Sequence, residues 1–206
     1  MQPDGPILLL SSIGEVFEGT CVNGLVLLAK ISGNSPNWNY NSPLWTSSNA
    51  SLNPTSLAFD LNEAKLKAYS QLPIQGLRVG MSNLDGSSLT WIDVPLGESY
   101  ASLQSAMSEG SLSTHAGRSA WTSLVPDDHS FSWEPYCNLE GLNVACSYGP
   151  TLRLGLLMND GTSCDSCDDA VGFGLNIWGN YESAGAIGGG NFNKFGYILG
   201  FPGKVF

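Results

Sequence analysis

The chain has 206 residues, of which 42% are hydrophobic and 10% aromatic, so it can form one folded domain with a core and is not disordered throughout. Charged residues make up only 13%, while glycine occurs 25 times, which excludes a mainly helical fold. The net charge of -10, with no basic cluster to offset it, excludes nucleic acids and anionic membranes as partners. No apolar run is long enough to cross a bilayer, so membrane insertion is not expected either.

The N-terminal quarter of the chain predicts a lead-in, a strand and a loop. Residues 1–15 are expected to form a mobile lead-in. The continuous apolar run at residues 24–31 is typical of a buried strand. Residues 34–54 are rich in Asn, Ser and Pro, which indicates a long surface loop, and aromatic side chains are spaced through it as anchors. These anchors are Trp38, Tyr40 and Trp45.

The middle of the chain predicts two short helices and a hairpin. Residues 60–72 carry a helical pattern, with Asp60 or Asn62 as the cap. Residues 77–81 and 89–94 are predicted strands, and the Asp-Gly pair between them favours a tight turn. A second helix is expected at residues 99–108, with Ser99 as the cap and with three side chains pointing inward, namely Leu103, Ala106 and Met107.

The C-terminal part predicts two strands around an acidic loop and a glycine-rich segment. The strands are residues 152–157 and 195–199, and the glycine-rich segment covers residues 176–193. Between the first strand and this segment, four aspartates fall within ten residues without a basic neighbour: Asp160, Asp165, Asp168 and Asp169. On a compact loop they would repel one another, and a bound calcium ion would reverse that effect. A solvated acidic turn is the alternative.

Matches to one family run in the same order through most of the chain. They comprise residues 24–31, Tyr40-Asn-Ser-Pro-Leu-Trp45, residues 64–66 and 77–81, Cys137-Asn138, residues 152–157, Cys164, Gly172-Phe-Gly174 and residues 195–199. In these features the chain resembles the fibrinogen C-terminal-like domains, particularly the lectin-like branch that includes intelectins. The resemblance implies a single α+β domain over residues 16–206, with a mixed or antiparallel sheet, few short helices and long ordered loops. It also implies calcium-dependent binding of glycans.

The same resemblance implies roles for particular residues. It pairs Cys137 with Cys164, which leaves Cys146 to pair with Cys167, although four cysteines allow three connectivities. Calcium would be held by some of Asn159, Asp160, Asp165, Asp168 and Asp169, together with backbone carbonyls. Apart from the resemblance, Trp178 and Tyr181, with Glu182 beside them, are the candidate carbohydrate-binding residues, because they lie just beyond the loop in a segment poor in other large side chains. Ordinary core packing of these aromatics is the alternative.

The chain departs from the family at three places. Asn23-Gly24-Leu25 stands where the family has Gly-Gly-Trp, Cys21 lacks its usual partner, and Asp168 and Asp169 stand where a histidine ligand is expected. A zinc site formed by the four cysteines between Cys137 and Cys167 is an alternative to disulfides. A thioredoxin-type role for Cys164-Asp-Ser-Cys167 is disfavoured, because Gly172-Phe-Gly174 does not suit a helix.

No enzyme is expected, because the sequence has no nucleophile elbow, no zinc-protease motif and no phosphate-binding loop. A triad of His115 or His129 with Asp127 or Asp128 has no motif to support it. The cysteines and the glycosylation sequon at Asn49 favour a secreted, extracellular glycoprotein. The leading hypothesis is a calcium-dependent carbohydrate-binding, lectin-like module, and any oligomer is expected to form through parts outside this chain. The alternative is a structural module of an extracellular coat, filament or matrix that binds neighbouring proteins.

Overall fold

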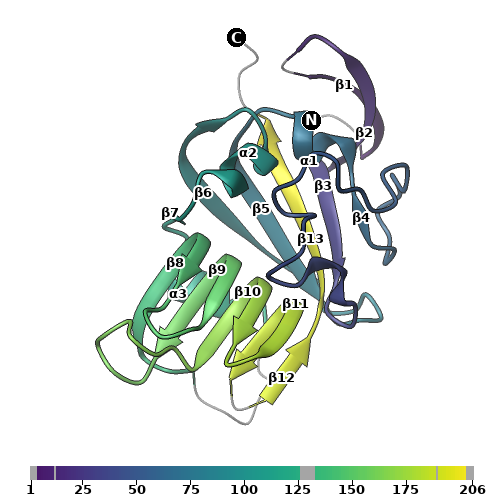
Figure 1. Cartoon of the computed structure of the whole chain (residues 1–206). Coiled ribbons are helices and arrows are strands. Elements are labelled where there is room, and N and C mark those ends of the chain that lie inside the picture. The colour runs from purple at the N-terminus through teal and green to yellow at the C-terminus, as the bar shows by residue number, and fades with distance from the viewer. Residues whose placement is uncertain (1–3, 12, 126–132, 189, 203–206) are drawn as a thin grey trace.

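The computed structural model describes residues 4–11, 13–125, 133–188 and 190–202. Its strands form two antiparallel sheets, and a few short helices pack beside them (Figure 1). Strands account for 49% of the chain and helices for 11%. The architecture is therefore rich in antiparallel sheet with few short helices, and it is not mainly helical, as the composition indicates. No helix in the described ranges is long and apolar enough to cross a membrane.

The larger sheet has seven strands and contains both ends of the described chain. Its order is β1-β2-β3-β13-β5-β6, with β4 on β3. The C-terminal strand β13 therefore lies in the middle of the sheet, where it pairs with β3 on one side and β5 on the other. The bounds are β1 (Gly5–Leu10), β2 (Val16–Val22), β3 (Leu25–Ser32), β4 (Ala64–Lys65), β5 (Ile74–Ser82), β6 (Thr90–Tyr100) and β13 (Phe195–Pro202).

The smaller sheet has six strands in the order β12-β11-β10-β9-β8-β7. The chain passes from β12 to β13 across Lys194, so one continuous segment joins the two sheets. The bounds are β7 (Leu112–Ser113), β8 (Tyr136–Ala145), β9 (Thr151–Asn159), β10 (Asp169–Ile177), β11 (Asn180–Gly188) and β12 (Gly190–Asn193). The glycine-rich segment predicted at residues 176–193 is thus largely sheet.

The main core combines apolar side chains of both sheets with the helices. The helices are η1 (Pro36–Trp38), α1 (Lys67–Gln71), α2 (Leu103–Ser108) and α3 (Arg118–Ser123). Leu28 of β3, Trp121 of α3 and Phe173 of β10 all belong to this core and are fully buried. The Phe173 ring lies so close to Gly196 of β13 that a Cβ there would overlap it, which shows how tightly the two sheets pack.

The lead-in predicted for residues 1–15 contains a strand. Residues 5–10 pair antiparallel with β2 as strand β1. Alternate side chains, including Ile7 and Leu9, pack against the main core, and this packing holds the segment in place. The domain therefore begins before residue 16.

The long loop at residues 34–54 is anchored by aromatic side chains, as predicted. Trp38 and Trp45 are fully buried, with their ring centroids 4.8 Å apart and nearly perpendicular. Tyr69 of α1 donates its hydroxyl to the backbone oxygen of Trp45 at 3.0 Å. Tyr40 lies under the guanidinium of Arg153 on the smaller sheet, which attaches the loop there as well.

The helix predicted for residues 60–72 forms only at its end, as α1. Ala64 and Lys65 pair with β3 instead of continuing the helix. The Asp60 carboxylate does not cap a helix, because it accepts a hydrogen bond from the buried Nζ of Lys30. Tertiary contacts with the larger sheet therefore override the local helical pattern.

The predicted hairpin is present as β5 and β6, which pair antiparallel around the Asp-Gly turn. The second helix is shorter than predicted, because the cap is Ser102 rather than Ser99. The Ser102 hydroxyl accepts a hydrogen bond from the Ser105 backbone N–H at 3.1 Å. Its inward side chains are as predicted, since Leu103, Ala106 and Met107 are all buried.

A row of glycines crosses the smaller sheet at one level. Gly141, Gly155, Gly172 and Gly185 are successive register partners on β8, β9, β10 and β11. Their φ angles lie between 144° and 154°, a region that essentially only glycine adopts. A Cβ at Gly155 would also overlap the carbonyl oxygen of Val171.

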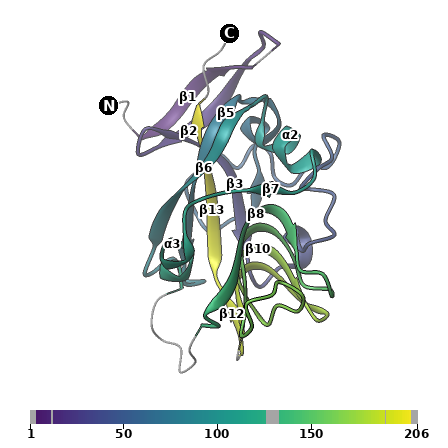
Figure 2. The ribbon, with the colours of Figure 1, turned by 90° about the vertical axis from the view of Figure 1, so that its left-hand side faces the viewer.

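The strands of the smaller sheet curve into an arch (Figure 2). The glycine row crosses them near their middles, at Gly141 of β8 and Gly155 of β9, and its unusual φ angles suit a bend there. Side chains from both halves of each strand meet inside it, such as Leu152 and Leu157 of β9 in one small buried cluster. The convex side of the same strands, including Leu154 and Met158, faces the main core.

Candidate functional site

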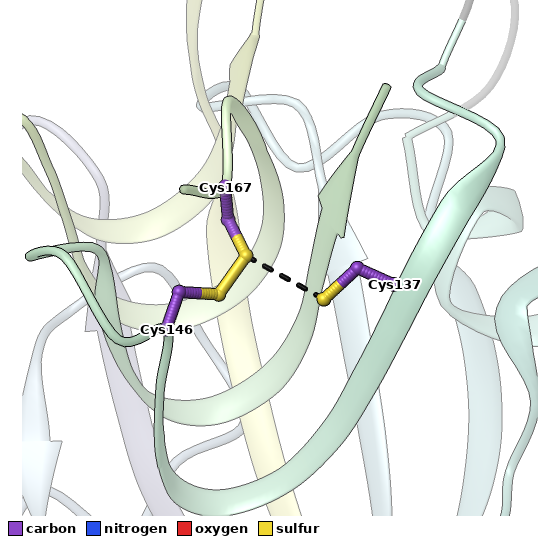
Figure 3. Close-up of side chains that lie close together, drawn as sticks. All are labelled: Cys137, Cys146 and Cys167. Carbon is purple, nitrogen blue, oxygen red and sulfur yellow. Dashed lines mark hydrogen bonds between the residues drawn. A yellow bond between two sulfur atoms is a disulfide. The ribbon is translucent and has the colours of Figure 1, made fainter. Parts of the chain in front are cut away.

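The arch brings the cysteines of residues 137–167 together on its concave side (Figure 3). Cys137 lies near the start of β8 and Cys146 directly after its end, yet their sulfur atoms and that of Cys167 all lie within 4.8 Å of one another. Disulfides join Cys137 to Cys164 and Cys146 to Cys167, the two pairs that the family resemblance implies. These bonds use the thiols that a zinc site would need. Cys21 is buried and free.

The acidic loop, residues 160–168, folds back toward the turn that joins β8 and β9. The backbone N–H of Ser147 donates to the Cys164 carbonyl at 3.1 Å, and that of Tyr148 donates to the Asp165 carbonyl at 2.7 Å. The Cys146–Cys167 disulfide makes a third link between these two segments. The loop and the turn therefore present one continuous surface.

The five predicted calcium ligands are not gathered at one point. Asp160, Asp165 and Asp168 are exposed, whereas Asn159 and Asp169 are buried. Asp169 stands opposite Met158 in the sheet and shares its convex face, so Asn159, the next residue, points to the concave face. The two buried side chains thus lie on opposite sides of the sheet.

Asp169 has a structural partner outside the loop. Its Oδ2 accepts a hydrogen bond from the backbone N–H of Glu134 at 2.8 Å, which ties the segment before β8 to β10. Burial raises the pKa of this carboxyl to about 6, and the Glu134 N–H partly opposes the shift by stabilising the charged form.

Calcium needs six to eight oxygens at about 2.3–2.6 Å, so the carboxylate ligands of one ion must lie within about 5 Å of each other. Within the described part of the chain, no three aspartate or glutamate side chains come that close. One feature does suit a cation: Asn159 Oδ1 is buried without a hydrogen-bond partner, while its Nδ2 donates to the Ser163 carbonyl. The carboxylates as placed do not form a complete calcium site.

Exposed aromatic side chains flank the acidic loop. Trp178 occupies the turn between β10 and β11 with a φ of 51°, and 56% of it is exposed. Its ring rests against Gly149, where a Cβ would lie 3.5 Å from the ring. Tyr148 is 69% exposed, and Tyr181 of β11 is 50% exposed. Tyr181 pairs with Asn176 and so lies on the face opposite that of Ile177, apart from the acidic loop.

We call Tyr148, Asp165 and Trp178 the aromatic–acidic surface.

Two predictions about this surface need revision. Glu182, a predicted ligand-binding residue, is buried beside the side-chain amide of Asn193, so it is not part of the surface. Tyr148 was missed, although a large aromatic next to glycine in the segment between Cys146 and Pro150 is a signal of an exposed turn. Its neighbour Gly149 has a φ of 115°, a backbone conformation that favours glycine, and the Trp178 ring lies beside it.

A separate hollow of about 360 Å³ lies beside α3 and contains the exposed side chain of His115. Glu140 in this hollow is already engaged, because its Oε2 accepts hydrogen bonds from the Gly117 N–H and from the Trp121 indole, both at 2.9 Å. His129, Asp127 and Asp128 lie outside the described residues. No triad is therefore assembled here among the described residues.

Comparison with known proteins gives no relative: no protein-family model, no curated protein and no solved structure matches the chain.

Proposed function

We propose that the protein is an extracellular carbohydrate-binding module that binds sugars at the aromatic–acidic surface. The observation that carries the proposal is the exposure of Trp178, which is 56% exposed while its ring is held against Gly149. Large aromatics are usually buried, and exposed ones that gather in a patch, as Trp178 and Tyr148 beside Gly149 do, are typical of a binding site. A flat ring in this position can stack on the apolar face of a sugar.

The charges beside the rings indicate the class of sugar. Asp160, Asp165 and Asp168 are exposed on the acidic loop, and the whole chain carries a net charge of -10. Carboxylates accept hydrogen bonds from sugar hydroxyls but repel sialylated or sulfated glycans. Neutral saccharides are therefore the proposed ligands.

Calcium binding remains a prediction, and the structure sets one condition for it. The exposed carboxylates must move toward the buried Asn159 Oδ1 before one ion can contact them together. Stacking on Trp178 does not depend on that movement. We therefore propose sugar binding through the rings both with and without calcium. A glycan array run with calcium and with chelator distinguishes these two cases.

An extracellular location is part of the proposal, and two intramolecular disulfides support it because such bonds persist in oxidising compartments. Membership of the fibrinogen-like, lectin-like branch is likewise proposed from the sequence resemblance. The β-rich architecture with few short helices is compatible with that membership.

A glycan array of neutral and acidic saccharides tests the function. Wild-type protein is applied with calcium and with chelator, beside Trp178→Ala, Tyr148→Ala and the control Leu84→Ala, which alters an exposed apolar side chain on the β5–β6 turn. We expect binding to neutral glycans, lost in the two aromatic variants and kept in the control. Binding to no glycan would reject the proposal, and binding lost in chelator would show that calcium is required.

The second candidate function, a structural module that binds neighbouring protein, is favoured by a different surface. The β1–β2 hairpin exposes large apolar side chains, among them Leu8 and Val16. A protein that bound no sugar but assembled through this hairpin would fit that function.

A further inference from the structure

Strand β1 is the outermost strand of the larger sheet (Figure 1). One edge pairs with β2, and no strand of the described chain pairs with the other edge. An open edge presents a row of unpaired backbone N–H and C=O groups, which can accept a further strand.

The register shows which amides face the open edge. The Ser11 N–H donates to the Glu15 carbonyl at 2.8 Å, so this pair is hydrogen-bonded across the hairpin. Pairs alternate along an antiparallel ladder, and therefore Leu10 with Val16 and Leu8 with Glu18 are pairs whose own N–H and C=O groups point outward. Pro6 faces outward too, with a carbonyl but no N–H.

Side chains at this edge are apolar and exposed. Leu8 is 73% exposed, Leu10 46%, Ile13 76% and Val16 65%. Leu10 and Val16 are register partners and so lie on one face of the hairpin, together with Leu8 and its exposed register partner Glu18.

Pro6, which faces outward without an N–H, is the one protective residue that β1 itself carries at this edge. Natural proteins protect open edges with charged side chains, and lysine is common there, yet residues 5–14 contain no charged side chain at all. A neutral, apolar, open strand in a chain of net charge -10 is typical of a strand that another strand covers.

We infer that the protein forms a two-fold symmetric dimer in which β1 of one copy pairs antiparallel with β1 of a second copy. A partner strand at this edge must be apolar to match the exposed Leu8 and Leu10. It must also be free of acidic groups, because a chain of net charge -10 would repel them. The β1 strand of a second copy meets both conditions, and its own open edge needs the same partner.

The symmetry fixes the register of this pairing. With Leu8 opposite Leu8 of the partner subunit, each Leu8 N–H donates to the other Leu8 carbonyl, and each Leu10 N–H reaches the Pro6 carbonyl across the interface. Pro6 has no N–H, so the Leu10 carbonyl opposite it receives no hydrogen bond from it. The Leu8 side chains of both copies meet on one face, where they leave water together.

The interface also predicts a salt dependence. Two copies of net charge -10 repel each other at long range, and added salt screens that repulsion. The apolar contact itself is not weakened by salt. The dimer is therefore expected to become tighter as sodium chloride is raised, whereas an interface held by ion pairs would become weaker.

Sedimentation equilibrium and light scattering on the full chain test the inference. Wild type is expected to approach twice the chain mass of 21.8 kDa as concentration rises. Leu8→Lys is expected to weaken dimerisation by about tenfold or more. Leu84→Lys, which adds the same charge to another exposed leucine, should leave dimerisation unchanged.

A matched pair of variants isolates the backbone contribution. Leu8→Ala and Leu8→Pro both remove the side chain, but only Leu8→Pro removes the outward N–H, and neither removes a hydrogen bond to β2. Leu8→Pro is expected to dimerise more weakly than Leu8→Ala, with unchanged circular dichroism for both. A monomer at every concentration, or a dimer that Leu8→Lys does not weaken, would overturn the inference. Neither result depends on sugar binding, so the carbohydrate proposal is tested separately.

Discussion

Cys137 and Cys146 lie nine residues apart, at opposite ends of β8, yet their sulfur atoms lie within 4.8 Å of each other. A straight strand would separate their Cα atoms by about 30 Å. Strand β8 must therefore turn back on itself between the two cysteines. Gly141, a member of the glycine row, lies midway between them. The arch in turn brings the acidic loop and the Tyr148 turn to one surface.

Substitution at the glycine row should unfold the arch. Gly155→Ala would place a Cβ onto the Val171 carbonyl in a backbone region that alanine avoids, so a loss of about 2 kcal/mol or more in unfolding free energy is expected. Gly161→Ala is the control, because its Cβ would meet only the Asn159 side-chain amide, at 3.6 Å. Urea denaturation measures the free energy of unfolding of both variants. Equal values would contradict the proposed role of the glycine row in the bend.

The second disulfide should stabilise the arch. Cys146→Ala with Cys167→Ala removes a link between segments 21 residues apart and is expected to lower the free energy of unfolding by about 2–4 kcal/mol. Cys21→Ala removes a buried thiol without a bond and serves as control. Urea titration with peptide mass mapping checks both the loss and the pairing, and a loss no larger than that of the control would count against the bond.

Asp169 should make stability depend on pH. Its pKa is raised from 3.8 to about 6 by burial, so the folded state binds this proton more tightly than the unfolded chain. Its contribution to stability is therefore fully present below about pH 4 and is lost as pH rises through 6. The loss should be on the order of 1–2 kcal/mol after solvent screening.

The variant Asp169→Asn isolates this carboxyl, because the other acidic groups titrate equally in both proteins. The wild-type free energy of unfolding, minus that of the variant, should fall between pH 4 and pH 7. Asparagine keeps an acceptor for the Glu134 N–H. A difference that stays constant with pH, or rises, would show that Asp169 has no raised pKa.

Several features of the fold could be predicted from the sequence because they follow from local pattern. The apolar run at residues 152–157 forms the core of β9, and the Asp-Gly turn joins β5 to β6. The aromatic anchors Trp38 and Trp45 are buried as expected. In each case the signal lies within a few neighbouring residues.

Other features depend on pairings that no local pattern specifies. Gly141, Gly155 and Gly172 form a row only once the register of three strands is known. The side of the sheet that Asp169 faces depends on the same register, because a shift of one residue reverses it. The predicted ligand set therefore combined side chains that the sheet separates, and Tyr148 joined the site only through a backbone contact with Asp165.

The most direct test of the proposed function is calorimetry with the neutral saccharide that binds best. Wild type, Trp178→Ala, Trp178→Phe and the control Leu84→Ala are titrated under the same conditions. Loss of the ring should weaken binding by about tenfold or more, phenylalanine should restore part of it, and the control should bind like wild type. Equal affinity of Trp178→Ala and wild type would contradict the account.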